Sequence, residues 1–149
     1  MIKKNGTDLP SRLKQAFGLG NLTRSDDFAN TISGGISGLQ STNWDPEQNS
    51  TDFGVYCDAV SSESVLYPSF AGLKSEVQDL IVAGGYADEV DSLVGPMLNW
   101  IGWLNASVVS TCTEKKTQDE CFTNYDATFY QKDDLKQTWR AWPYQYCTQ

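Results

Sequence analysis

The longest regular hydrophobic pattern in the chain lies between residues 88 and 111. Its large apolar residues recur with the i, i+3, i+4, i+7 spacing of one helix face: Val90, Leu93, Val94, Met97, Leu98, Ile101, Leu104 and Val108. Asp88, Glu89 and Asp91 stand in the expected first turn, where carboxylates favour the helix dipole. Pro96 lacks a backbone N–H, so we expect a kink just before it or two helices meeting there. The pattern predicts the central core helix.

Two shorter helices are expected near the start of the chain. Residues 8–17 combine a helix start at Asp-Leu-Pro-Ser with a short apolar stripe, and Gly18 follows. Ser25 is expected to be the N-cap of a second helix, which the glycine cluster 34–38 should end. That cluster (GGISG) superficially resembles a nucleophile elbow, but no buried strand precedes it, so Ser37 receives no role.

Two further helices are expected before the central one. Thr51 should cap a helix whose apolar residues lie between positions 53 and 60, and residues 61–68 form a serine-rich loop. Residues 73–81 repeat the helical spacing until the glycines at 84–85. No clean alternating strand of useful length occurs. The sequence therefore predicts an all-α fold, an irregular helical bundle in a single domain over residues 1–149.

Charge and composition exclude several classes of function. The net charge is −8 and basic residues do not cluster, which argues against nucleic acid as a partner. Polar and glycine residues at 99, 102 and 105 interrupt the central apolar run, so we expect no membrane span. The chain contains no histidine, so it cannot assemble a Ser-His-Asp or Cys-His site, and histidine-ligated metal sites are excluded as well. No metal, cofactor or catalytic residue is predicted.

Cysteines and glycosylation sequons indicate an extracellular product. Four cysteines without CxxC spacing favour disulfides over zinc; pairing Cys112 with Cys121 would leave Cys57 with Cys147, one of three connectivities. Four N-x-S/T sequons begin at Asn5, Asn21, Asn49 and Asn105. Residues 5–10 are polar where a signal peptide would be apolar. A secretory body without a secretion signal predicts a piece of a longer protein.

The C-terminal stretch is rich in aromatic residues. Trp139, Arg140, Trp142 and Tyr144 could stack on a ligand or form a cation–π pair, and they form a candidate substrate-binding cluster. The alternative interpretation is that these side chains pack against a segment that follows in an intact protein.

Eight blocks in order resemble one family, and the blocks are 13–19 (LKQAFGL), 26–30 (DDFAN), 43–46 (NWDP), 53–59 (FGVYCDA), 83–86 (AGGY), 109–112 (VSTC), 121–126 (CFTNYD) and 138–148 (TWRAWPYQYCT). The family is that of the serine peptidases that include lysosomal Pro-Xaa carboxypeptidase and dipeptidyl peptidase II, particularly their secreted fungal relatives. In that family an α/β-hydrolase carries the catalytic residues and a helical insertion caps the active site.

The resemblance implies that this chain corresponds to the helical insertion, with residues 138–149 beginning the return to the catalytic domain. The nucleophile elbow would lie upstream and the aspartate and histidine downstream. Peptide substrates would then be bound through that catalytic domain, in a secreted or vacuolar/lysosomal parent, which could form a homodimer. Pro143 stands where dipeptidyl-peptidase-like members have an acidic residue, which favours a proline-preferring carboxypeptidase or endopeptidase. Gln149 stands where the family usually has glutamate.

Two interpretations from other classes remain open. A free-standing secreted helical binding protein would use the C-terminal aromatic cluster on an apolar ligand. A carboxylate-pair hydrolase would use the acid pairs 26/27, 88/91 or 133/134, although capping and dipole effects at helix starts also explain these acids.

Overall fold

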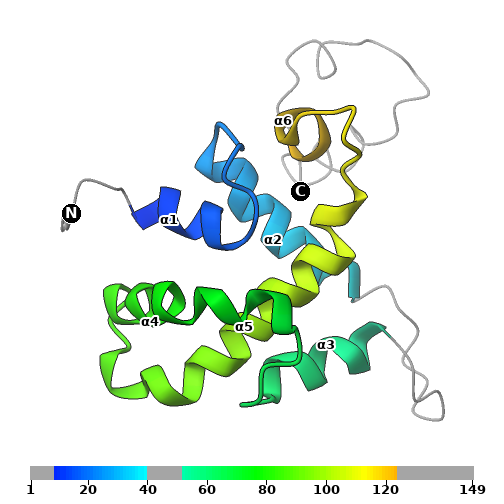
Figure 1. Cartoon of the computed structure of the whole chain (residues 1–149). Helices are drawn as coiled ribbons and strands as arrows, with labels where there is room; N and C mark the ends of the chain where they lie inside the picture. Colours follow the sequence, from blue (N-terminus) through cyan, green and yellow to red (C-terminus); the bar gives the residue numbers. More distant parts are fainter. Residues whose placement is uncertain (1–8, 40–51, 124–149) are drawn as a thin grey trace, which may run out of the picture.

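The structure, a computed structural model, describes residues 9–39 and 52–123, which form helices joined by short loops (Figure 1). The helices in chain order are α1 (Leu9–Ala16), α2 (Ser25–Leu39), α3 (Asp52–Ser61), η1 (Pro68–Leu73), α4 (Lys74–Ala83), η2 (Ala87–Glu89), α5 (Val90–Ser107), η3 (Val109–Thr111) and α6 (Gln118–Phe122). Within these ranges no β-strand occurs, and the predicted all-α fold is confirmed. None of the helices described is long and apolar enough to cross a membrane.

Helix α5 runs through the middle of the molecule, with α4 beside it and α2 and α3 packed against other parts of its length (Figure 1). Every residue of the apolar face predicted for it is buried or half-buried. Leu98, Ile101 and Leu104 lie at the centre of the core, with exposed fractions of 1%, 0% and 0%. The prediction of a central core helix is therefore confirmed.

The start of α5 differs from the sequence expectation in two respects. The helix is continuous through Pro96, so the expected junction of two helices is wrong. A proline inside a helix removes one hydrogen bond, and we attribute the unbroken helix to the burial of its neighbours Val94, Gly95 and Leu98. Asp88 and Glu89 lie in η2, which precedes α5, so only Asp91 occupies the first turn.

Helix α2 continues through the glycine cluster that the sequence expects to end it, as far as Leu39. The reason is contact with α5: a Cβ on Gly35 would lie 3.0 Å from Leu104 Cδ1 and 3.2 Å from Val108 Cγ2. Glycine thus allows close helix approach here instead of forming a turn. The Ser37 hydroxyl donates to the Gly34 carbonyl at 3.1 Å within this helix, which is not the strand–turn–helix geometry of an elbow. The helix begins at Ser25 itself, one residue before the expected start.

A second face of α5 is made of small and polar residues. Gly95, Asn99 and Gly102 follow i, i+4, i+7 spacing, and residues 62–67, between α3 and η1, pack on them. A Cβ on Gly95 would meet the Glu63 backbone, and one on Gly102 would lie 2.6 Å from Tyr67 Cδ2. Asn99, fully buried, accepts from the Leu66 N–H at 2.7 Å and donates to the Ser62 and Ser64 carbonyls at 3.1 and 2.8 Å. This face anchors the loop predicted at 61–68.

The remaining predicted helices agree with the structure in position. Helix α1 ends before Gly18, whose φ of 71° lies in the left-handed region that glycine adopts most readily. Helix α4 ends at the 84–85 glycines, with Gly85 at a φ of 98°. The expected cap at Thr51 lies outside the described residues.

Candidate functional site

An apolar pocket of about 440 Å³ opens between α1, α3, α4 and α5. Its walls come from elements far apart in the sequence, and its lining residues are Leu9, Leu13, Tyr56, Val60, Leu80, Ile81, Gly84, Tyr86, Leu93, Pro96, Met97 and Trp100. Concave apolar sites of this size are typical binding sites for small molecules and for apolar side chains. The pocket is the candidate functional site of the described part of the chain.

A few polar groups interrupt the apolar lining. The Trp100 indole Nε1–H is buried and has no hydrogen-bond partner among the described residues. Indole N–H groups usually find a partner when buried. Burial raises the pKa of the Tyr56 hydroxyl, with a smaller contribution from Cys57. An apolar ligand suits this lining.

An ion-pair network joins α1 and α4, which form two walls of the pocket. Arg12 Nε donates to Glu76 Oε1 at 2.7 Å, and its Nη2 lies 3.5 Å from Asp79 Oδ2. The Glu76 hydrogen bond raises the pKa of Arg12 and, reciprocally, lowers the pKa of the Glu76 carboxyl. The network links these two walls, although partly exposed pairs contribute only about 0–1 kcal/mol.

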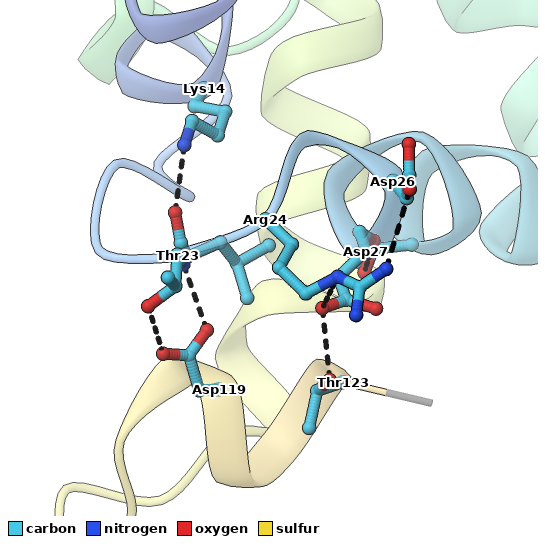
Figure 2. Close-up of polar contacts among 9 residues, drawn as sticks. Lys14, Thr23, Arg24, Asp26, Asp27, Asp119 and Thr123 are labelled. Carbon is cyan, nitrogen blue, oxygen red and sulfur yellow. Dashed lines mark hydrogen bonds and ion pairs between the residues drawn. The ribbon is translucent and has the colours of Figure 1, made fainter. Parts of the chain in front are cut away.

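A second polar feature joins the α1–α2 connection to α6, and we call it the polar clasp. Thr23 donates to Asp119 through its amide N–H at 2.9 Å and through its hydroxyl at 2.6 Å (Figure 2). Gln118 Nε2 donates to the Gly18 carbonyl at 2.7 Å, and Gln118 Oε1 accepts from the Asn21 amide N–H at 2.9 Å. These hydrogen bonds hold α6 against the α1–α2 connection.

Charged residues at the start of α2 extend the clasp. Asp27, 3% exposed, accepts from the Thr123 hydroxyl at 2.9 Å (Figure 2). Arg24 Nε lies 3.9 Å from Asp27 Oδ2, and Arg24 Nη2 lies 3.4 Å from Asp26 Oδ2. Lys14 donates to the Leu22 carbonyl at 2.8 Å. In the described part of the chain these acids serve structural contacts rather than facing the pocket.

One predicted disulfide is present. Cys112 and Cys121 are bonded, with 5.6 Å between their Cα atoms, and they close the short loop that leads into α6. Cys57 lies half-buried on α3 and forms no disulfide with a described residue. Its predicted partner, Cys147, lies outside the described residues, so that pairing stays a prediction.

Other residues singled out from the sequence fall in different places. The candidate cluster of Trp139, Arg140, Trp142 and Tyr144 lies outside the described residues, as do the sequons at Asn5 and Asn49. No group of three possible ligands that could hold a metal ion occurs among the described side chains. The sequence does not predict the pocket, because Tyr56 and Trp100 stand on helices whose patterns indicate ordinary core; Trp100 shares the stripe of Leu93 and Met97, which could have drawn attention to it.

Acid should weaken the polar clasp. Hydrogen bonds from the Thr23 side chain and backbone lower the pKa of Asp119 in the folded state, so its stabilisation is complete above the unfolded pKa of about 3.9 and is lost below it. We expect Asp119→Asn to reduce the protection of the α6 amides at pH 7 and to flatten their dependence on pH. Hydrogen exchange of the Cys121 and Thr123 amides measures this.

The control for the clasp experiment is Asp88→Asn, an exposed acid in η2, which should leave α6 unchanged. Hydrogen bonds from Thr117 lower the pKa of Glu120 in the same helix. Acid therefore weakens two carboxylate contacts of α6 in the parent chain. Only the difference in amide protection between the parent and Asp119→Asn reports on the clasp. Equal protection of the parent and Asp119→Asn at every pH would contradict the role given to Asp119.

The described residues thus form an all-helical fold with an apolar pocket. Among curated proteins, the chain is 42% identical over 150 residues to a protein of Arthroderma benhamiae described as a probable extracellular serine carboxypeptidase. The match covers 100% of this chain and 21% of the relative, so the chain spans about a fifth of that protein's length. No family model and no solved structure matches the chain. The chain therefore matches a partial region of a serine carboxypeptidase, which confirms the resemblance at that level.

Proposed function

We propose that this chain is the helical cap of a secreted serine-type exopeptidase, proline-preferring and carboxypeptidase-like. It would roof an active site supplied by other segments and limit access to peptide ends. The observation that carries the proposal is the 42% identity along the whole chain to one fifth of a serine carboxypeptidase. Because the chain lacks histidine, a serine triad would need residues from outside it.

The pocket gives the cap a physical means of acting. A roof with an apolar underside excludes water from a reacting peptide, which strengthens the electrostatic interactions beneath it. An apolar cavity of about 440 Å³ would accept an apolar residue near a substrate terminus. A proline residue is of this kind, since its ring is compact and apolar and its backbone carbonyl accepts hydrogen bonds.

The purified 149-residue chain is expected to hydrolyse no prolyl peptide. In a chimera of the Arthroderma benhamiae relative, this chain would replace the matching region, and serine-reagent-sensitive release of C-terminal residues should be retained. Deleting the region should allow internal cleavage of longer peptides. Peptide cleavage followed by mass spectrometry measures all three.

Two outcomes would contradict the cap. One is serine-type hydrolysis by the chain alone. The other is a folded deletion variant that still cleaves only at peptide ends, since the region would then have no part in access. Asp88→Asn in the chimera is a suitable control, because Asp88 is exposed in η2 and does not line the pocket, so end selectivity should stay unchanged.

The pocket also favours a second function, that of a free-standing helical binding protein. The relevant observation is the apolar lining itself, to which the Trp100 side chain contributes. Titration with a small apolar amide, followed by tryptophan fluorescence, would show saturable quenching in the parent chain and a loss of it in Met97→Arg. Saturable binding by the isolated chain together with an inactive chimera would favour this function over the cap.

A further inference from the structure

Two glycosylation sequons lie in the described part of the chain, and their acceptor side chains have opposite surroundings. Asn105 stands near the end of α5 and is half-buried, whereas Asn21 lies in the α1–α2 connection and is exposed. The sequence treats them as equivalent, because both satisfy the N-x-S/T pattern. Their burial and hydrogen bonds distinguish them in the folded chain.

Both N–H groups of the Asn105 side-chain amide donate hydrogen bonds inside the fold. Its Nδ2 donates to the Ile101 carbonyl at 2.9 Å and to the Phe17 carbonyl at 3.2 Å, which occupies both amide hydrogens. The turn that follows α1 packs directly on it, since a Cβ on Gly18 would lie 2.6 Å from Asn105 Oδ1. A sugar on Nδ2 would replace one of these hydrogens and would need the space that the turn occupies.

The Asn21 side chain is placed differently. Its backbone is held, because the Asn21 amide N–H donates to Gln118, and Leu22, 2% exposed, anchors the next position in the core. The side chain itself is exposed and makes no hydrogen bond within the described residues. A bulky solvated group at this Nδ2 leaves the neighbouring contacts intact.

We propose that the folded protein carries an N-linked glycan on Asn21 and none on Asn105, which is a structural residue locking α5 to the turn after α1. In the transfer, Nδ2 of Asn21 bonds to C1 of the first sugar of a lipid diphosphate-linked oligosaccharide. The bond from C1 to the diphosphate breaks, the lipid diphosphate leaves, and Nδ2 loses one proton to a base on the transferase. A chain modified at Asn105 would not reach this fold and would be lost before secretion. The inference requires entry into the secretory pathway and does not depend on peptidase function.

The test is site occupancy in the 149-residue chain secreted from yeast behind an appended signal sequence. Enzymatic deglycosylation in heavy-oxygen water labels each formerly modified asparagine, and peptide mass spectrometry reads each sequon separately. We expect label at Asn21 and none at Asn105. Label at Asn105 in folded, secreted protein would overturn the proposal, and so would a secreted protein without label at Asn21.

Three variants separate modification from structure. Asn21→Gln should remove one glycan from the secreted protein and leave the thermal midpoint of the deglycosylated chain unchanged. Ser107→Ala removes the Asn105 sequon at an exposed position and leaves Asn105 itself unchanged. Neither the mobility on a gel nor the thermal midpoint should therefore change. Asn105→Gln should lower the thermal midpoint with no loss of glycan mass. A mobility shift in Ser107→Ala, or an unchanged midpoint in Asn105→Gln, would contradict the assignment.

Discussion

Replacing Gly95 by alanine is expected to lower the free energy of unfolding by about 3 kcal/mol. The added Cβ would meet the Glu63 carbonyl oxygen and lie 2.7 Å from the carbonyl carbon and 3.0 Å from the Cα. These are backbone atoms, so no side-chain rotation relieves the overlap. Residues 62–67 would have to lift from α5, and the hydrogen bonds of Asn99 to that loop would be strained with them.

The matched control is Gly34→Ala in α2. A Cβ there meets nothing within 4 Å, and the position is exposed on a helix. Alanine should stabilise the domain by about 0.5–1 kcal/mol, because glycine loses more backbone entropy on entering a helix. Urea unfolding followed by circular dichroism measures both variants. The two variants should change the free energy of unfolding in opposite directions. An unchanged free energy of unfolding in Gly95→Ala would show that residues 62–67 do not pack on α5 in this way.

The second large effect is expected from Asn99→Ala, which should destabilise the domain by about 2–4 kcal/mol. The side chain is fully buried and satisfies one backbone donor and two backbone acceptors of the loop between α3 and η1. Alanine removes the partner of the Leu66 N–H and of the Ser62 carbonyl, leaves the Ser64 carbonyl with only the Ser62 hydroxyl at 3.1 Å, and opens a cavity in the core. Chemical unfolding and the exchange rate of the Leu66 amide hydrogen report the loss.

Two further substitutions test the reason for that loss. Asn30→Ala, on the exposed side of α2, should change stability by no more than about 0.5 kcal/mol. Asn99→Asp keeps the shape and the acceptor but places a carboxylate against two carbonyls. Burial raises the pKa of such an acid above its unfolded value, so this variant should lose further stability as pH rises from about 4 to 7. A pH-independent Asn99→Asp would contradict the hydrogen-bond assignment.

Helix positions could be predicted because burial imposes a period on the sequence. The apolar stripe of α5 is long enough that tertiary contacts could not override it, and the stripe of α4 behaves in the same way. Glycine was the main source of error. In α2, Gly35 permits contact with Leu104 of α5, and a local reading cannot distinguish that role from a helix end. Pro96 is similar, since the surrounding packing keeps the helix continuous.

The candidate site was less accessible from the sequence. The Cys112–Cys121 disulfide was predictable because the two cysteines enclose a short polar loop. The pocket was not, because its walls combine residues from positions 9 to 100, and only the fold brings Leu9, Tyr56 and Trp100 together. The same holds for the clasp, whose Thr23 and Asp119 are 96 residues apart and carry no mutual signal in the sequence.

The separation within the clasp has a consequence for biosynthesis. Ribosomes add about 5–20 residues per second, so roughly 5–20 s pass between the synthesis of Thr23 and that of Asp119. Throughout that interval the turn after α1 emerges from the tunnel without its later partner. The nascent chain can complete this corner only after Thr123, the last described residue, has left the ribosome, so the corner stays open until all of the described chain has been translated.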